Sequence, residues 1–353
     1  MRLASPEGAE TAEGNAPEPD GSAASLPVAT DAMVPAWPHR HLLDLDVLDR
    51  ADIELVMRTA DSMTEVLART IPRVPALRGT SVTILFYEAS TRTRVSFEVA
   101  AKNLSADVVN IAAATSSVAK GESLVDTVRT VEALGADVLV IRHPVSGAPW
   151  LAAEVFGGSV LNGGDGWHAH PTQALLDLYT LRGRLPGGSV EGRKIVILGD
   201  VLHSRVARSN IWGLTAAGAD VWLCGPSTLL RGFEAWAAAH VAGRRFRITS
   251  DLPAALRDAD AIMALRIQRE RMTGGLLPSL REYAARYGLT RERLGLAKPE
   301  VLVLHPGPMN EGVEIAPDVA SGPHSVITDQ VANGVAIRMA LLYLLAGARE
   351  GSG

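Results

Sequence analysis

The sequence predicts an α/β protein built from two doubly wound parallel-sheet domains. From residue 81 onward, short apolar runs alternate with helix-like segments, which is the pattern of parallel strands covered on both faces by helices. A cluster of glycine and proline at Gly183–Gly188 interrupts this pattern and indicates a domain boundary. The length of 353 residues also favours two domains, because single hydrophobic cores stop growing near roughly 250–300 residues.

Residues 1–38 form the first segment and are rich in Ala, Gly, Pro, Ser and Glu. One of the 34 basic and six of the 39 acidic residues lie here, so the remaining chain carries 33 of each and is formally neutral. Because the segment lacks apolar periodicity, it cannot bury enough surface to offset its ordering entropy. We therefore expect a disordered N-terminal extension, with a partner-binding arm as the alternative.

Residues 39–184 are assigned to the first domain, with order beginning near His41. A helix is expected up to about Ala68, and its apolar face comprises Ile53, Val56, Met57 and Ala60. Strands are expected at 81–87, 107–111, 137–141 and 159–162, and helices near 93–103, 122–134 and 148–156. A long helix from Pro171 to Arg182 then leads to the boundary.

Residues 185–328 are assigned to the second domain, which repeats the alternation of strands and helices. Its strands are expected at Lys194–Leu198, Asp220–Leu223, Phe246–Ile248, Ala261–Leu265 and Val301–Leu304. The C-terminal segment 329–353 contains a helix from about Asp329 to Ala346 that is apolar on one side. We expect this helix to pack back on the first domain.

Composition excludes several classes of function. The chain is 47% hydrophobic and 21% charged, as in globular proteins, and no apolar run is judged long enough to cross a bilayer, so no membrane partner is expected. The start of the chain lacks a secretory signal. The single cysteine, Cys224, excludes an internal disulfide and a cysteine-based metal site and fits a cytoplasmic location. No basic stripe for nucleic acid is present.

The run Ser90-Thr91-Arg92-Thr93-Arg94 follows an expected strand and opens an expected helix. Free backbone N–H groups and the helix dipole favour an anion at a helix N-terminus, and guanidinium groups bind its oxygens in pairs. Two arginines at this position oppose the dipole unless an anion is present, so we predict a phosphate cradle. Ordinary N-capping by Ser90 with a solvated basic turn is the alternative.

Other polar clusters follow other strands, at the edge where open parallel sheets bind ligands. The loop Thr115–Glu122 carries Lys120 and is either mobile surface or a flap that closes over an anionic substrate. Arg142 and His143 end the third expected strand and form either part of a site or a solvated turn.

The segment Asn162–Gln173 contains three glycines, which permit close backbone approach, and the histidines His168 and His170. A metal pair is disfavoured, because no third ligand clusters with the two histidines. We expect instead that a neutral His170 donates a hydrogen bond to a substrate oxygen, and we predict neither a metal nor a cofactor.

The second half lacks a dinucleotide fingerprint, because Gly199 stands alone where G-x-G-x-x-G is required. Arg205 begins a helix and is placed for another anion. Arg266 and Gln268 point the same way if the backbone after their strand stays extended. The turn His305–Asn310 has two prolines around one glycine, which predicts a stiff turn with room for a cis bond and with either a structural or a binding role.

Taken together, these motifs resemble those of the carbamoyltransferase family, and most closely its aspartate branch. The resemblance runs from about His41 to Leu345 and rests on STRTR (90–94), RHP (142–144), HPTQ (170–173), GD-x-x-HSRV (199–206), R-x-Q (266–268) and HPGP (305–308). The S-M-G segment and H-C-L-P turn of the ornithine branch are missing. The resemblance implies carbamoyl transfer from carbamoyl phosphate, bound first, to L-aspartate, in an active site in the cleft between two domains and early in pyrimidine synthesis.

The resemblance also implies a role for each matching residue. The residues that would hold the phosphate are Ser90, Thr91, Arg92 and Thr93, with Ser116 and Lys120 from a neighbouring subunit. The residues that would polarise the carbamoyl oxygen are Thr93, Arg142 and His170, which with Arg92 form the catalytic set. The groups that would take the carbamoyl amino group are Gln173 and the backbone carbonyls of Gly307 and Pro308. The residues that would bind aspartate, beside those two carbonyls, are Lys120, Arg205, Arg266 and Gln268.

Family resemblance further implies a homotrimer with shared active sites, and leaves regulatory or dihydroorotase-like partner chains open. Three features depart from the family pattern: Glu311 replaces a frequent arginine, Lys120 stands without a second lysine, and residues 1–38 have no counterpart. A different amine acceptor is one alternative. A catalytically inactive homologue that serves in assembly is another, and the complete set of basic clusters disfavours it.

Overall fold

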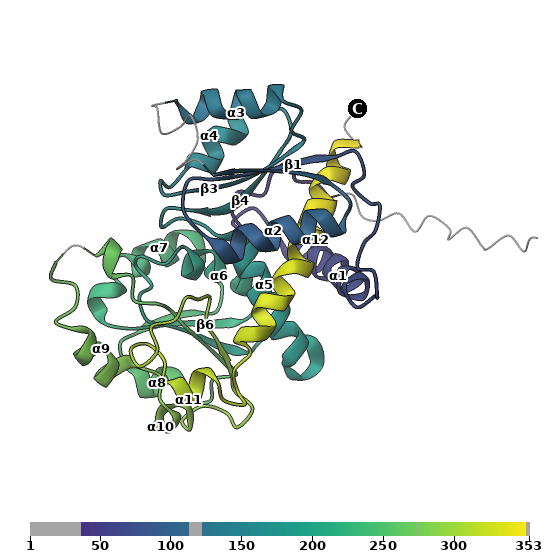
Figure 1. The fold of residues 1–353 in the computed structure, drawn as a ribbon. Helices are drawn as coiled ribbons and strands as arrows, with labels where there is room; N and C mark the ends of the chain where they lie inside the picture. The colour runs from purple at the N-terminus through teal and green to yellow at the C-terminus, as the bar shows by residue number, and fades with distance from the viewer. Residues whose placement is uncertain (1–36, 113–121, 273, 351–353) are drawn as a thin grey trace, which may run out of the picture. The chain divides into compact units, whose positions relative to one another are not determined.

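The computed structural model describes residues 37–112, 122–272 and 274–350. Within these ranges the chain forms two parallel sheets, joined by the helix α5 (Pro171–Arg184) (Figure 1). The expected α/β class with two parallel sheets is therefore confirmed.

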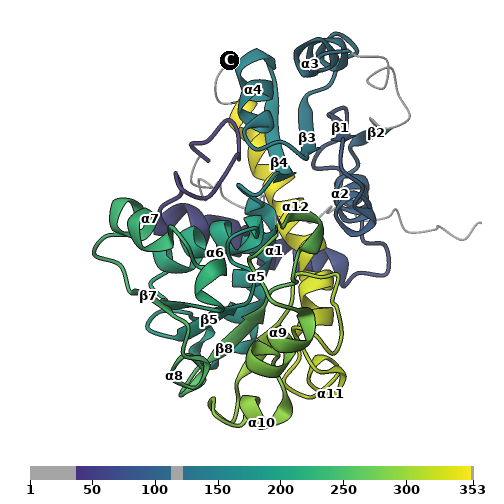
Figure 2. The ribbon, with the colours of Figure 1, turned by 90° about the vertical axis from the view of Figure 1, so that its left-hand side faces the viewer.

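The first sheet has the strand order β2-β1-β3-β4, and all neighbours are parallel. Its strands are β1 (Ser81–Phe86), β2 (Asp107–Ala112), β3 (Val138–His143) and β4 (Ser159–Asp165). Helices α3 (Leu124–Ala133) and α4 (Ala148–Val155) cover one face, and α2 (Thr91–Asn103) lies on the other (Figures 1 and 2). Alternate strand residues therefore face different cores: Leu85 and Leu139 pack with α3 and α4, while Ile84 joins the opposite core.

The second sheet has the order β7-β6-β5-β8-β9 and is also entirely parallel. Its strands are β5 (Lys194–Leu198), β6 (Asp220–Cys224), β7 (Phe246–Thr249), β8 (Ala261–Ala264) and β9 (Leu302–Leu304). Its helices are α6 (Arg205–Ala216), α7 (Phe233–His240), α8 (Leu252–Leu256), α9 (Leu280–Tyr287), α10 (Arg291–Leu294) and α11 (Pro317–Ala320). Short 3-10 turns occur at η3 (Pro186–Gly188), η4 (Ser227–Leu229) and η5 (Arg269–Arg271).

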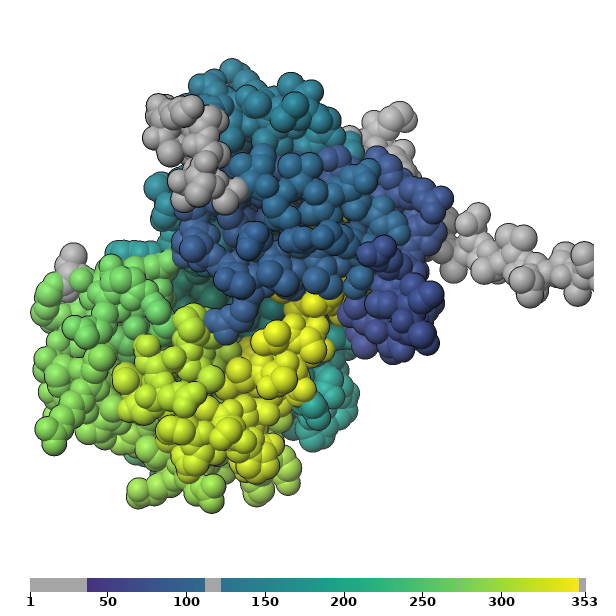
Figure 3. Space-filling model, in the orientation of Figure 1, coloured from purple at the N-terminus to yellow at the C-terminus, as the bar shows by residue number. Residues whose placement is uncertain are grey.

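Two long helices complete the described chain. Helix α1 (Arg50–Leu67) has Asp49 as its N-cap residue, whose side chain accepts a hydrogen bond from the N–H of Asp52 in a capping box. Helix α12 (Ile327–Glu350) packs against α1, α2 and α5, and one hydrophobic core contains residues from all four helices and both sheets. In Figure 3 the yellow C-terminal residues accordingly lie against the blue residues of the first sheet's half.

Helix α12 corrects the expectation that the chain has no apolar run long enough to cross a bilayer. The 22 residues Ile327–Ala348 contain an 18-residue window with a mean hydropathy of 1.6, so by length and composition they match a membrane span. However, 56% of the most apolar window is buried inside the protein, and core helices pass the same test. The apolar residues of this helix pack against α1, α2 and α5 in the hydrophobic core.

The predicted strands all occur, with differences at their ends. β3 extends to His143 and β4 to Asp165, beyond the predicted ends at 141 and 162, because the two strands stay paired across an irregularity between Ile141 and His143. These longer strands carry polar residues that hydropathy alone assigned to loops.

Candidate active site

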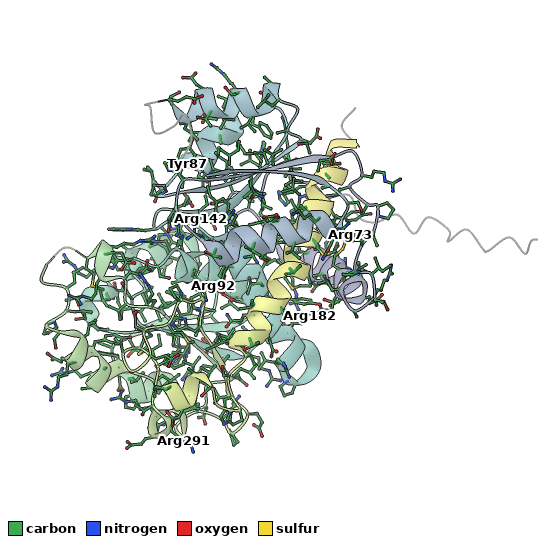
Figure 4. All side chains as sticks on the ribbon, in the orientation of Figure 1. Arg73, Tyr87, Arg92, Arg142, Arg182 and Arg291 are labelled. Atoms are coloured by element: carbon green, nitrogen blue, oxygen red, sulfur yellow. The ribbon has the colours of Figure 1, made fainter. Side chains whose placement is uncertain are left out.

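A cavity of about 640 Å³ lies where the carboxyl ends of both sheets meet. The predicted site residues that line it are Ser90, Thr91, Arg92, Thr93, Arg142, His170, Gln173, Arg205, Arg266, Gln268, Gly307 and Pro308. Segments more than 200 residues apart in the sequence thus contribute to one cavity. In Figure 4, Arg92 and Arg142 lie at the centre of the described chain, whereas Arg73 and Arg291 lie at its periphery.

The start of α2 forms the floor of the cavity on the side of the first sheet. Ser90 is the N-cap residue, but its side chain makes no capping hydrogen bond, which contradicts the alternative of ordinary N-capping. The N–H groups of the first turn therefore keep their capacity to bind an anion. Thr93 is buried and Arg92 faces the cavity, while Arg94 is exposed and does not line it.

Arg92 lies directly against the turn that follows β9. Gly307 in this turn has φ +63°, and a Cβ at Gly307 would overlap the guanidinium of Arg92. The peptide bond between Gly307 and Pro308 is cis, as the prediction of a stiff turn allowed. His305 holds the turn, because its Nδ1 accepts the N–H of Gly307 at 2.8 Å and its Nε2 lies 3.2 Å from Oε1 of Glu314.

Arg142 is the last but one residue of β3 and is a buried residue of the cavity lining. Its Nη1 donates to the carbonyl of Gly163 at 3.1 Å, and its Nη2 donates to Glu88 at 3.0 Å. Burial, assisted by the charge of Arg205, lowers the pKa of Arg142 to about 10, so the side chain remains a cation near neutral pH. Gly164, with φ +119°, leaves room for both guanidiniums, because a Cβ there would lie 2.9 Å from Nη1 of Arg142.

Glu88 is a site residue that sequence reasoning missed. Its Oε1 accepts a hydrogen bond from Arg205 at 2.6 Å and another from Arg142, and lies 3.6 Å from Nη2 of Arg271. Burial acts to raise the pKa of Glu88, but the hydrogen bond from Arg205 and the surrounding guanidiniums outweigh it, so the pKa is lowered. Its position two residues before Ser90, at the end of a strand, was the available signal.

His170 is the N-cap residue of α5 and Gln173 lies in its first turn. Both line the cavity together with residues 90–93 at the start of α2. The backbone N–H of His170 donates to Oγ of Ser209 at 2.9 Å, while its Nδ1 is buried without a partner among the described residues. Burial and the neighbouring Arg142 and Arg205 hold the pKa of His170 well below its usual value, so the imidazole is neutral. Nε2 of Gln173 donates to Asp177 at 2.9 Å.

The second sheet supplies the opposite wall. Arg205 is buried in the first turn of α6, and its Nη1 has no hydrogen-bond partner within the described ranges. Arg266 forms an ion pair with Glu270. The side chain of Gln268 donates to the carbonyl of His203 at 3.0 Å, and its backbone N–H donates to Asp200 at 3.2 Å.

Several predicted residues are not among those that line the cavity. Ser116 and Lys120 lie outside the described residues. Glu311, which stands where the family often has an arginine, does not line the cavity, so this change of charge does not alter the cavity lining. His168 packs edge-on against Trp150 and lies 3.4 Å from Asp165, and no metal-binding group of three or more His, Cys, Asp or Glu occurs in the described part of the chain.

Charge identifies the ligand class. The cavity lining includes six arginines and two glutamates, and sequence reasoning overlooked two of these arginines, Arg271 and Arg338. Arg338 comes from α12 and donates to Oγ of Ser96 at 2.8 Å. An excess of guanidinium groups, three of them buried, beside an uncapped helix N-terminus is suited to a ligand with several negative charges.

Comparisons with known proteins agree with this geometry. A family model described as aspartate/ornithine carbamoyltransferase, carbamoyl-P binding domain, matches residues 40–183, and its Asp/Orn binding domain matches residues 191–345. An aspartate carbamoyltransferase catalytic subunit from Roseiflexus sp. (strain RS-1) is 61% identical over 308 residues, covering 87% of this chain and 95% of that protein. One from Chloroflexus aurantiacus (strain ATCC 29366 / DSM 635 / J-10-fl) is 58% identical over 87% of this chain and 98% of its own.

Solved structures give the same result. The catalytic subunit of aspartate transcarbamoylase from M. jannaschii has a TM-score of 0.77 at 33% identity, covering 89% of this chain and 100% of that chain. Aspartate transcarbamoylase from Trypanosoma cruzi in complex with N-(phosphonacetyl)-L-aspartic acid has a TM-score of 0.75 at 32% identity, covering 85% and 94%. The same protein has also been solved with carbamoyl phosphate and aspartate, at a TM-score of 0.74 and 31% identity over 85% of this chain and 94% of that chain.

Proposed function

This chain belongs to the aspartate/ornithine carbamoyltransferase family, and we propose that it transfers the carbamoyl group of carbamoyl phosphate to the amino group of L-aspartate. The products are N-carbamoyl-L-aspartate and phosphate, and the reaction is an early step of pyrimidine synthesis. The observation that carries the proposal is that one cavity joins an uncapped helix N-terminus from one sheet to buried Arg205 and partly buried Arg266 from the other.

The cradle at the start of α2 suits the phosphate. Arg92 and the free N–H groups of the first turn provide a cation and aligned donors, and Ser90, Thr91 and Thr93 add hydroxyl groups. Arg142, neutral His170 and Thr93 surround the position for the carbamoyl oxygen. Gln173 and the carbonyls of Gly307 and Pro308 offer acceptors to the carbamoyl amino group.

The opposite wall suits the two carboxylates of aspartate. Arg205 has a buried Nη1 with no described partner, which is a donor ready for a carboxylate oxygen. Arg266 and Gln268 line the same wall. Arg266 is already paired with Glu270, so an incoming carboxylate has to join or displace that internal acid.

These positions support a direct attack. The amine nitrogen of aspartate adds to the carbonyl carbon and the C–N bond forms. The negative charge that develops on the carbonyl oxygen is stabilised by Arg142, His170 and Thr93. The bond from carbon to the bridging phosphate oxygen then breaks, and the departing phosphate takes the amine proton. Alignment of two bound reactants contributes roughly 7–11 kcal/mol, and one oxyanion donor contributes about 3–4 kcal/mol.

A two-substrate assay tests the proposal. Purified protein supplied with carbamoyl phosphate and L-aspartate is expected to release N-carbamoyl-L-aspartate and phosphate in equal amounts. Screening other amines in parallel tests the alternative acceptor, and the basic wall at Arg205 and Arg266 favours a dicarboxylate. Absence of turnover by folded protein would refute the proposed reaction.

We also propose that the enzyme is a cytoplasmic homotrimer in which Ser116 and Lys120 of one subunit complete the site of the next. The solution mass tests the trimer. Mixing Lys120→Ala chains with Arg92→Ala chains tests sharing, because some sites in mixed trimers would contain both intact residues. Recovery of activity is expected, and its absence would mean that each subunit has a self-contained site.

A further inference from the structure

Asp177 lies on α5, one turn after Gln173, and is completely buried beneath the cavity. Its Oδ1 accepts hydrogen bonds from Nε2 of Gln173 at 2.9 Å and from Nε2 of Gln330 at 2.7 Å. Its Oδ2 accepts a hydrogen bond from Nδ2 of Asn210 at 2.8 Å. The three amides belong to α5, α12 and α6, so one carboxylate connects three helices.

The chemistry of this carboxylate determines how Gln173 is oriented. An ionised carboxylate has only acceptor atoms, so each neighbouring amide must turn its NH2 group toward it. The carbonyl oxygen of Gln173 is therefore directed away from Asp177. This Oε1 has no hydrogen-bond partner among the described residues, and the side chain of Gln173 lines the cavity.

Asp177 is ionised in neutral and alkaline buffer. Burial raises its pKa to about 6, although the hydrogen bonds from Asn210, Gln330 and Gln173 oppose the rise. Arg338, buried on α12, is a nearby positive charge that also favours the ionised form. In neutral and alkaline buffer the group therefore acts as an acceptor only.

A second branch leads from Asp177 to the turn at Gly307. Oε1 of Gln330 accepts the backbone N–H of His305 at 3.0 Å. His305 in turn accepts the N–H of Gly307 on its Nδ1 at 2.8 Å. The carboxylate thus supports both Gln173 and the turn that contains Gly307 and Pro308, all of which line the cavity.

We propose that Asp177 is a positioning residue that sets the specificity of the cavity for an amino group on the carbonyl carbon of the phosphate ligand. It does so by presenting the oxygen of Gln173, together with the turn carbonyls, as acceptors for the two N–H bonds of a carbamoyl group. This inference rests on the proposed function. It predicts that an acyl group with a methyl in place of the amino group binds about 10- to 100-fold more weakly, because the acceptors then lose their donors.

Two stable ligands that differ only in this group provide the test. Phosphonoacetamide carries the amino group and acetonylphosphonate carries a methyl. Calorimetric titration of the full chain gives the ratio of their dissociation constants. In Asp177→Asn, of nearly the same size, the new amide can donate to Gln173 and allow it to flip, so the ratio is expected to fall at least fivefold toward one. A purely structural loss would weaken both ligands equally and leave the ratio unchanged.

Control variants define the outcome. Gln173→Ala is expected to lower the ratio, and the double variant Asp177→Asn/Gln173→Ala to lower it by less than the two single changes combined, because both changes remove the acceptor on Gln173. Asp260→Asn is the matched control, since buried Asp260 accepts hydrogen bonds from the N–H of Lys194 at 2.9 Å and from Lys298 at 2.7 Å, next to the amino-terminal end of β5. It is expected to keep the wild-type ratio.

Two results would overturn the inference: a wild-type ratio in folded Asp177→Asn, or an equal fall in Asp260→Asn. If Asp177→Asn does not fold, Gln330→Leu replaces it, because this change removes the link from Asp177 to His305. The ratio for Gln330→Leu is expected to fall at least threefold, and an unchanged ratio would also overturn the inference. Wild-type turnover of carbamoyl phosphate with L-aspartate is measured alongside. Its absence refutes the proposed function, whereas turnover with an unchanged ratio refutes only the role of Asp177.

Discussion

At the first sheet, Arg92 stands beside an uncapped helix N-terminus and has no acidic partner in the described ranges, whereas at the second sheet Arg205 and Arg266 are bonded to Glu88 and Glu270. A phosphate can approach Arg92 and the start of α2 without displacing a described group, although Arg142 of the same sheet is paired with Glu88. In the second half an incoming carboxylate finds Nη1 of Arg205 free of described partners but otherwise competes with Glu88 and Glu270. The comparison indicates that the phosphate half is preformed and that the dicarboxylate half exchanges its partners on binding.

The largest effect is expected from Arg92→Ala, which removes the unpaired cation of the preformed half. We expect activity to fall about 100- to 1,000-fold, the range seen when one essential donor is lost. Because the side chain has no hydrogen bond or ion pair with other described residues, the free energy of unfolding should change by less than about 0.5 kcal/mol. Steady-state kinetics and chemical denaturation measure the two quantities. Activity near that of the wild type would contradict the prediction that Arg92 binds the phosphate.

Arg205→Ala tests the exchanging half. The loss of a charged donor to a carboxylate is expected to raise the KM for aspartate about 10- to 100-fold, in line with roughly 1.5–3 kcal/mol for a hydrogen bond to a charged group. The binding of phosphonoacetamide should change much less, since Arg92 and the start of α2 remain. Calorimetry of that ligand beside aspartate kinetics separates the two effects. Equal weakening of both ligands would mean that the two halves are not distinct.

Glu88→Gln removes the acid that joins three guanidiniums. We expect the free energy of unfolding to fall by about 1–3 kcal/mol at neutral pH, because Arg142, Arg205 and Arg271 then repel one another without a counter-charge.

The pH dependence of this loss follows from the lowered pKa of Glu88. Its stabilising contribution is complete above the ordinary value of 4.5 and disappears as the pH falls through the lower folded value. The stability difference between wild type and Glu88→Gln should therefore shrink in acid. Denaturation curves from neutral pH to about pH 3 measure it, and a difference that grows in acid would be the wrong sign.

The smallest effect is expected from Arg94→Ala, two residues from Arg92 on the same helix. Arg94 is exposed and lies outside the cavity lining, so activity should change less than about twofold. This variant is the matched control for Arg92→Ala, because both remove one arginine from the first turn of α2. A large loss here would show that general charge, rather than position, matters.

Sequence reasoning identified the parts of the site that use unusual residue combinations at strand ends. STRTR at 90–94 and the pair Arg266 and Gln268 were visible because cations and hydroxyls cluster after apolar strands. Glu88 was missed, since a single acid after a strand is ordinary until the fold brings Arg142 and Arg205 to it. Asp177 was missed for a similar reason, because its amide partners are distributed over three helices.

The same limit explains α12. Its apolar composition fits either a buried core helix or a membrane span, and only its contacts with α1, α2 and α5 separate the two. Arg338 on this helix reaches Ser96 on α2, a contact between residues 242 positions apart that no local pattern encodes. Contacts between charged and polar residues far apart in the sequence are therefore the part of the site that could be identified only from the structure.

The contrast between the two halves is tested most directly by titrating each half alone. Phosphonoacetamide should bind the free enzyme, whereas succinate, an unreactive dicarboxylate, should bind at least about tenfold more weakly alone and should tighten once phosphonoacetamide is present, as expected for coupled sites. Isothermal titration calorimetry measures all three affinities on the same preparation. Succinate that binds the free enzyme as tightly as phosphonoacetamide, with no change when both are present, would contradict a preformed phosphate half and an exchanging dicarboxylate half.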